Sequence, residues 1–158
     1  MLLVFSVMPV SEICNRSVVV MQRDETVLEA ARLMREHHVG DVVVVEDRNG
    51  TRVPVGIVTD RDLIMEIMAL GLDQTVITVG DIMEQELVTA KGSTGIFEAV
   101  QYMRHKTVRR LPIVDENGAL IGILTLDDLL ELLSEEFLAI AKLVNYERQK
   151  ECRHRASI

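Results

Sequence analysis

Residues 53–63 read VPVGIVTDRDL, and residues 119–129 read ALIGILTLDDL. Both stretches contain Gly, two aliphatic residues and Thr in that order, followed three residues later by Asp. The shared order indicates an internal repeat at a shift of 66 residues. Upstream the shift is 69, which aligns Val10–Asp47 with Val79–Glu116. The first copy therefore carries three extra residues near the turn at Asn49 and Gly50, where insertions are tolerated.

The composition excludes several broad classes. The chain has 158 residues and a net charge of −8, with 48% hydrophobic but only 3% aromatic residues. This aliphatic content supports a packed core rather than a disordered chain. The acidic balance argues against a general nucleic-acid binder, and the scarcity of aromatic residues argues against base stacking. We find no run of about 18 apolar residues that would span a membrane. Two distant cysteines form no disulfide framework, which favours a cytoplasmic protein.

Each copy has the pattern strand, helix, strand, strand, helix. In the first copy we expect strands at 18–21, 42–45 and 55–58, and helices at 27–38 and 61–70. In the second copy we expect strands at 87–90, 111–114 and 121–124, and helices at 96–103 and 127–133. The run 42–45 has no polar alternation, so that strand should be buried on both faces. Pro112 lacks a donor, which predicts an edge strand or the start of a strand.

The predicted fold is α+β: two tandem βαββα repeats packed sheet to sheet with pseudo-two-fold symmetry, plus a C-terminal helix. We divide the chain into an N-terminal arm (1–9), repeat 1 (10–73), repeat 2 (74–134) and a helical tail (135–158). The tail has apolar residues at helical spacing and a basic end: Phe137, Ile140, Ala141, Val144, and Arg148, Lys150, Arg153, Arg155. Its apolar stripe could pack on a second copy, on another protein or on its own module.

Thr and Asp recur at the start of the last helix of each copy, as Thr59 and Asp62 and as Thr125 and Asp128. One interpretation is a capping box, in which Thr caps the helix and the carboxylate returns to the cap. The other is a ligand site, because a helix N-terminus suits an anion and the carboxylate could accept ribose hydroxyls. For the other helices we expect caps from Thr26 or Asp24, and from Ser93 or Thr94.

Positive charge gathers in residues 104–110, which read RHKTVRR and precede the strand at 111–114. A charge run is usually a solvated face. Here two adjacent guanidinium groups, Arg109 and Arg110, would repel one another, and an anion between them would relieve this. Arg suits forked contacts with phosphate. The first copy has Gly40 and Asp41 at the same positions, and Asp41 would repel phosphate.

These motifs resemble a tandem pair of cystathionine-β-synthase (CBS) domains, a Bateman module, over about residues 10–134. The resemblance rests on VGDIM at 79–83, RRLPIVD at 109–115, the Asn-Gly turns and the GILTLDD stretch. It implies adenosine-ligand binding in clefts between the repeats. One cleft would use Asp128 for the ribose, Thr125 beside it, Arg109 and Arg110 for phosphates, and Val20, Val42 and Val44 near the adenine. The second cleft would use Thr59, Asp62, Thr89, Leu111, Pro112 and Ile113.

We find no nucleophile or base constellation and no metal-ligand spacing. The adjacent His37 and His38 point to different helix faces and are interpreted as surface histidines. We therefore expect a non-catalytic regulatory module that needs no cofactor, binds AMP, ADP or ATP and forms a homodimer that controls an unknown protein. The alternatives are a ligand-free dimerisation or scaffold module, or a site for S-adenosylmethionine or NAD.

Overall fold

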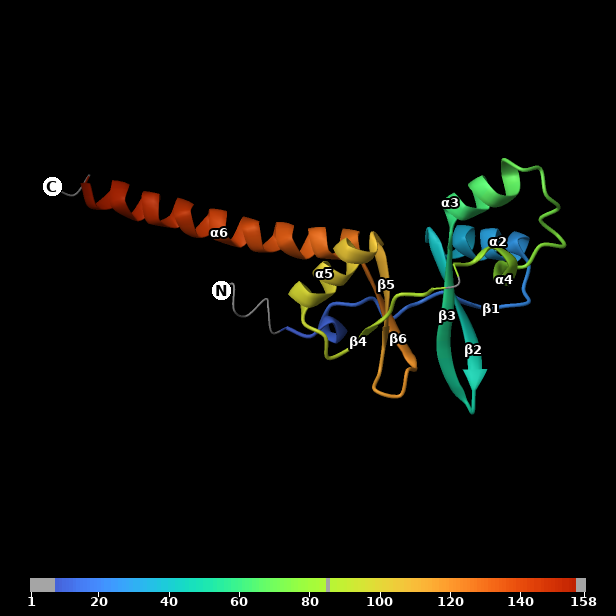
Figure 1. The fold of residues 1–158 in the computed structure, drawn as a ribbon. Helices are drawn as coiled ribbons and strands as arrows, with labels where there is room; N and C mark the ends of the chain where they lie inside the picture. Colours follow the sequence, from blue (N-terminus) through green and yellow to red (C-terminus); the bar gives the residue numbers. More distant parts are fainter. Residues whose placement is uncertain (1–7, 85, 156–158) are drawn as a thin grey trace. The chain divides into compact units, whose positions relative to one another are not determined.

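The computed structural model describes residues 8–84 and 86–155 and divides into two units, 1–124 and 125–158. Residues 1–7 of the expected N-terminal arm lie outside the described residues. The fold is α+β, with two three-stranded sheets in the orders β1-β2-β3 and β4-β5-β6. Figure 1 shows α2 beside the first sheet and α5 beside the second. Each sheet with its helix comes from one sequence repeat, as predicted.

The first sheet is built from β1 (Val20–Gln22), β2 (Asp41–Arg48) and β3 (Thr51–Thr59). The strand β1 runs parallel to β2, and β2 and β3 form an antiparallel hairpin. Between β1 and β2 lies α2 (Val27–His37), whose buried residues recur at helical spacing. Thr26 caps this helix, since its hydroxyl accepts from the Glu29 amide, which confirms one of the two predicted caps.

The second sheet repeats this arrangement with β4 (Ala90–Lys91), α5 (Ile96–Lys106), β5 (Arg110–Val114) and β6 (Leu120–Thr125). Pro112 was expected in an edge strand or at the start of its strand; β5 is the middle strand of its sheet, and Pro112 is the third of its five residues. The pairing nevertheless starts late: β4 meets β5 first at Ile113, whereas the first copy begins with the Val43 amide donating to the Val19 carbonyl. Pro112 aligns with Val43 and cannot make that bond, which accounts for the shorter β4.

The strand β2 is buried on both faces, as its unbroken run of valines predicts. Val42 and Val44 lie in the core cluster that also contains Ala30 of α2. Val43 and Val45 belong to a second cluster, with Ile123 of β6. This second cluster joins the two sheets, so the two repeats share a core.

The connecting segments are exchanged between the repeats. The short helix η1 (Val10–Glu12) belongs to the first repeat by sequence, yet the Val10 amide donates to the Thr94 carbonyl of the second. The helix α4 (Val79–Ile82) does the reverse, with the Val79 amide donating to the Glu25 carbonyl. The two bonds correspond, since Val10 and Val79 lie 69 residues apart, as do Glu25 and Thr94. Val10 and Val79 are fully buried, so the exchanged segments help to build the core.

The last helix of the first repeat begins as α3 (Asp60–Asp62) and continues as the π-helix η2 (Leu63–Met68). The sequence predicts an ordinary α-helix here, but the bonds from the Ala69 amide to the Ile64 carbonyl and from Leu72 to Ile67 span five residues. The turn that follows contains Gly71 with a φ of 64°, a conformation that Gly adopts easily.

The second unit is a single helix, α6 (Leu126–Arg155), of 30 residues. The sequence predicts a separate helix at 127–133 and a helical tail from 135, whereas the structure joins them without a break. The expected caps for α5 are wrong as well, because its N-cap is Gly95 and makes no side-chain cap bond.

Candidate functional site

Thr125 and Asp128 form a complete capping box at the start of α6. The Thr125 amide and hydroxyl both donate to Asp128 Oδ2, at 2.8 and 2.7 Å, and the Asp128 amide donates to Thr125 Oγ1 at 3.1 Å. Thr59 and Asp62 repeat this geometry at α3, with the Thr59 amide and hydroxyl both 2.7 Å from Asp62 Oδ2. Within the described part of the chain, both carboxylates are bonded through Oδ2 and have no hydrogen-bond partner on Oδ1.

A third capping box lies at the start of α4, where no ligand role is proposed. Thr78 and Asp81 make two of the three bonds at α4, with the Thr78 amide and hydroxyl 2.9 and 2.8 Å from Asp81 Oδ2, while the Asp81 amide donates to the Thr78 carbonyl. These two bonds lower the pKa of Asp81 below its ordinary value. The sequence analysis assigned no ligand role to Asp81. The bonding pattern is therefore that of a helix start, and a ligand role for Asp62 or Asp128 needs further support.

Arg110, a predicted phosphate contact, is engaged within the protein. Its Nε donates to Asp41 Oδ1 at 2.9 Å, and the two side chains are 30% and 14% exposed. The guanidinium also lies over Gly40, where an added Cβ would come within 3.2 Å of Arg110 Nη2. The expectation of an uncompensated arginine pair is thus wrong for Arg110, because Asp41 of the other repeat supplies the opposite charge.

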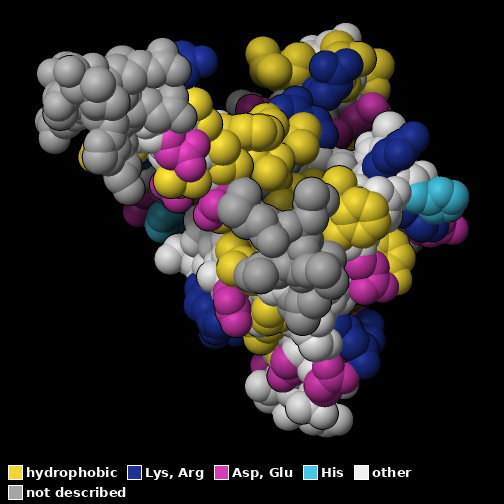
Figure 2. Space-filling view, turned by 90° about the vertical axis from the view of Figure 1, so that its left-hand side faces the viewer, with side chains coloured by type: hydrophobic (Ala, Val, Ile, Leu, Met, Phe, Trp, Pro, Cys, Tyr) yellow, Lys and Arg dark blue, Asp and Glu magenta, His cyan; other side chains and the backbone are white. Residues whose placement is uncertain are grey.

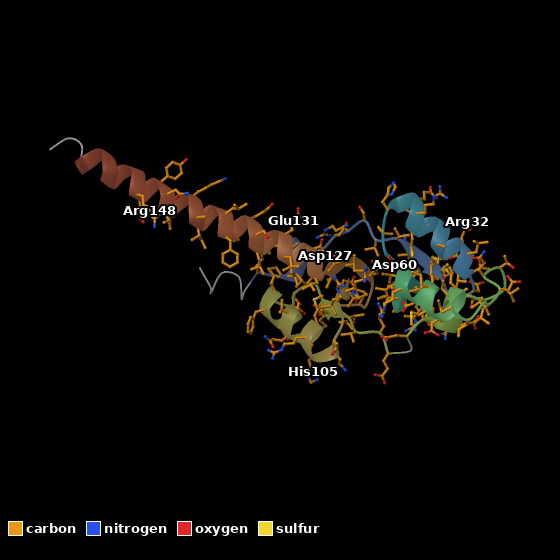
Figure 3. All side chains as sticks on the ribbon, turned by 90° about the horizontal axis from the view of Figure 1, so that it is seen from above. Arg32, Asp60, His105, Asp127, Glu131 and Arg148 are labelled. Atoms are coloured by element: carbon orange, nitrogen blue, oxygen red, sulfur yellow. The ribbon has the colours of Figure 1, made fainter. Side chains whose placement is uncertain are left out.

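The remaining predicted residues differ in their access to a ligand. The side chains of five of them are fully buried in the core: Val42, Val44, Leu111, Pro112 and Ile113. These five residues therefore present almost no accessible surface to a ligand. Val20 is half-buried, whereas Thr89 and Arg109 are exposed. Figure 3 shows the side chains on the ribbon, with Asp60 labelled at the start of α3.

One cavity of about 670 Å³ contains a residue of the predicted second cleft, Thr89. Its lining comes from the segment before β4 and from the end of α5: Glu84, Glu86, Leu87, Val88, Thr89, Lys106 and Val108. Thr89 and the basic run that contains Lys106 were predicted from the sequence, but the two glutamates were not. With two carboxylates and one ammonium group, the lining carries a net negative charge, which disfavours a phosphate.

Across 8–84 and 86–155, no three His, Cys, Asp or Glu side chains are grouped so that they could hold a metal ion. Over the same part of the chain, no helix is both long and apolar enough to cross a membrane.

Two comparisons with known sequences give the same result. The CBS domain pattern matches residues 10–69 and 79–135. An uncharacterised protein of Methanopyrus kandleri is 41% identical over 123 residues, which span 78% of this chain and 61% of that protein. A CBS domain-containing protein of Bacillus subtilis is 39% identical over 121 residues, which span 76% of this chain and 81% of the relative.

Solved structures share the fold. A conserved protein from Pyrococcus horikoshii has a TM-score of 0.71 and 33% identity, covering 80% of this chain and 92% of that one. A CBS domain pair solved with 5′-methylthioadenosine and S-adenosyl-L-methionine has a TM-score of 0.70, and the match covers 82% and 98% of the two chains. At 22% identity this second likeness concerns the fold alone. The twofold match and the repeated βαββα units lead to one conclusion: the chain belongs to the CBS domain family and contains a tandem CBS pair.

Proposed function

We propose that this CBS pair is a non-catalytic regulatory module that binds an adenosine-containing ligand, with AMP, ADP or ATP preferred. The observation that carries the proposal is the Asp128 carboxylate. The Thr125 box fixes its orientation through Oδ2, and its Oδ1 has no hydrogen-bond partner among the described residues. A fixed carboxylate with an available oxygen suits the hydroxyls of a ribose. The basic residues Arg109 and Arg110 take the phosphates.

The two proposed clefts are unequal. The cleft of Asp62 and Thr59 includes Thr89, which lines the acidic cavity with Glu84 and Glu86. It also lacks an arginine pair, since the first repeat has Gly40 and Asp41 at those positions. We assign it a nucleoside-like ligand or none, because phosphate would meet negative charge. Binding at the Asp128 cleft signals by favouring one packing of the module over another, which requires a difference in affinity between the two states.

The wider setting follows from the same proposal. The module works in the cytoplasm as a homodimer and controls the activity of a partner protein. S-adenosylmethionine is the first alternative ligand, since a solved CBS pair of the same fold was obtained with it. NAD is the second alternative, because it also carries an adenosine group.

A ligand-free scaffold is the second candidate function, and two observations favour it. The Thr78–Asp81 box has the same two bonds from Thr to the carboxylate as the two proposed ligand boxes, so capping accounts for those bonds. Arg110 is already neutralised by Asp41. In this alternative the module only dimerises or positions a partner.

Thermal unfolding of the full chain separates the two candidates. We expect the melting temperature to rise with one of AMP, ADP, ATP, S-adenosylmethionine or NAD. A ligand present at about 100 times its Kd adds about 2.7 kcal/mol, which corresponds to roughly 5–10 °C for a chain of this size. Unchanged melting with all five ligands would favour the scaffold.

Substitutions then test the assignment of residues. Asp128→Asn should abolish the ligand-induced shift, while Asp62→Asn should reduce it less. Asp81→Asn is the matched control, because it removes the same type of capping carboxylate at a position with no proposed ligand role. Equal losses for Asp62→Asn and Asp128→Asn would contradict the inequality of the clefts.

A further inference from the structure

The helix α6 carries an apolar seam that the regulatory proposal does not use. Its members follow one another at steps of four, three, four, three and four residues: Leu126, Leu130, Leu133, Phe137, Ile140 and Val144. The five steps average 3.6 residues, and their alternation between three and four matches the spacing of the a and d positions of a heptad repeat.

The seam is exposed along its whole length. Phe137 is 69% exposed and Leu130 is 53% exposed, and the other four members lie between 38% and 45%. Figure 2 shows hydrophobic side chains over much of the surface in that view. A continuous exposed apolar stripe on a helix of 30 residues, about 45 Å long, is typical of a surface that another helix covers.

Charge is divided between the two halves of the helix. Residues 127–136 contain five carboxylates and no Lys or Arg. Residues 142–155 contain five Lys or Arg and two Glu. Figure 3 shows Glu131 towards the start of α6 and Arg148 towards its other end. The helix is therefore complementary to a second copy of itself that runs in the opposite direction.

We propose that α6 pairs with α6 of a second copy of this chain as an antiparallel coiled coil centred between Phe137 and Ile140. In this arrangement the apolar seams of the two copies meet at the centre of the pair. Residues 127–136 of each helix then lie opposite residues 141–150 of its partner, which contain three Lys or Arg and one Glu. A parallel pair would place the acidic half of one helix against the acidic half of the other. It would also bring Glu147, which takes the next seam position after Val144, against the partner's Glu147.

Sedimentation of the full-length chain tests the pairing. We expect the double substitution Phe137→Glu and Ile140→Glu to halve the number of 17.8 kDa chains in each particle. The control Leu138→Glu changes a neighbouring residue that is 60% exposed but lies off the seam, so it should keep the wild-type assembly. Circular dichroism would verify that both variants remain helical. A monomeric wild type, or a seam variant with unchanged mass, would overturn the proposal.

A distance measurement between the two copies tests their orientation. A spin label at Arg148→Cys, in a Cys152→Ser background, leaves Cys14 as a buried thiol. In an antiparallel pair centred between Phe137 and Ile140 the two labels are separated by 19 residues of rise, about 28 Å. In a parallel pair they lie about one helix diameter apart, roughly 10–12 Å between the backbones. A label separation near this shorter value would contradict the antiparallel arrangement.

Discussion

Asp41 and Arg110 occupy equivalent positions in the two repeats, since they lie 69 residues apart, yet they carry opposite charges. Equivalent residues close to a pseudo-two-fold axis can meet one another. Here the Arg110 Nε lies 2.9 Å from Asp41 Oδ1, and this ion pair links the start of β5 with the start of β2. The first repeat has Gly40 and Asp41 where the second has an arginine pair, and this difference has a structural role. Gly40 leaves room for the Arg110 guanidinium, and Asp41 binds it.

Asp41→Asn should have opposite effects on stability and on phosphate binding. The loss of a partly buried charge partner should lower the free energy of unfolding by about 1–2 kcal/mol. Freed from this carboxylate, Arg110 should bind a phosphate-bearing ligand more tightly, by about 1 kcal/mol or roughly fivefold. Urea unfolding and titration with ATP would measure the two effects, and adenosine binding should stay unchanged.

The matched control for Asp41→Asn is Glu46→Gln, which removes one negative charge from the same strand. Glu46 pairs with Arg23 and Arg48 at the surface, away from Arg110. We expect it to leave ATP affinity unchanged. If Asp41→Asn weakened ATP binding, then Asp41 would support the phosphate site and our assignment of its role would be wrong.

The regular elements were predictable because their signals are local. The unbroken valines of 42–45 and the helical spacing after Val27 each identify an element within one short window. The sequence pattern does not predict that β4 is short, which follows from the bond that Pro112 cannot make. It also does not predict that η2 is a π-helix, which follows from its five-residue bonds. The sequence shows the opposite charges of Asp41 and Arg110 at the 69-residue offset, but equivalent positions in two repeats need not touch, so the sequence alone does not predict their ion pair.

Two glycines align in the repeated strands, and each is crossed by a segment from the other repeat. At Gly122 of β6 an added Cβ would lie 2.5 Å from Cys14 Sγ and 3.0 Å from the Asn15 carbonyl oxygen. At Gly56 of β3 an added Cβ would contact the Met83 side chain. Cys14 and Met83 are again 69 residues apart, so the same close crossing occurs twice.

We predict that Gly122→Ala destabilises the protein more than Gly56→Ala. Asn15 cannot retreat easily, because it exchanges two backbone bonds of 2.9 Å with Ile123. The flexible Met83 side chain can adjust to a methyl group at Gly56. Overpacking at Gly122 should cost about 1–3 kcal/mol, measured by urea unfolding. In a strand without such a crossing, Gly→Ala is usually stabilising, so a more stable Gly122→Ala variant would show that the crossing is looser than described.

At the scale of the whole molecule, neither repeat is complete without the other. The segment around η1 bonds to residues 92–96 and 123, while the segment around α4 bonds to residues 23–27. Val10, Cys14, Val79 and Met83 are all buried by this exchange. The sequence shows that the copies exist but not which copy each segment packs on, because a shift of 69 residues relates the segments equally well in either arrangement. The expected boundary at residue 73 therefore remains a proposal about sequence repeats.

The exchange leads to a prediction for the separated halves of the chain. Fragments 8–73 and 74–158 each lack the segment that covers their own core, so each should fail to unfold cooperatively when heated alone. Mixed in equal amounts, they should regain the far-ultraviolet circular dichroism and the cooperative melting of the intact protein, at a lower temperature that rises with concentration. A mixture of 8–73 with a 74–158 fragment carrying Val79→Asp should not recover, because Val79 is fully buried. Cooperative melting of either fragment alone would mean that the repeats are independent folding units.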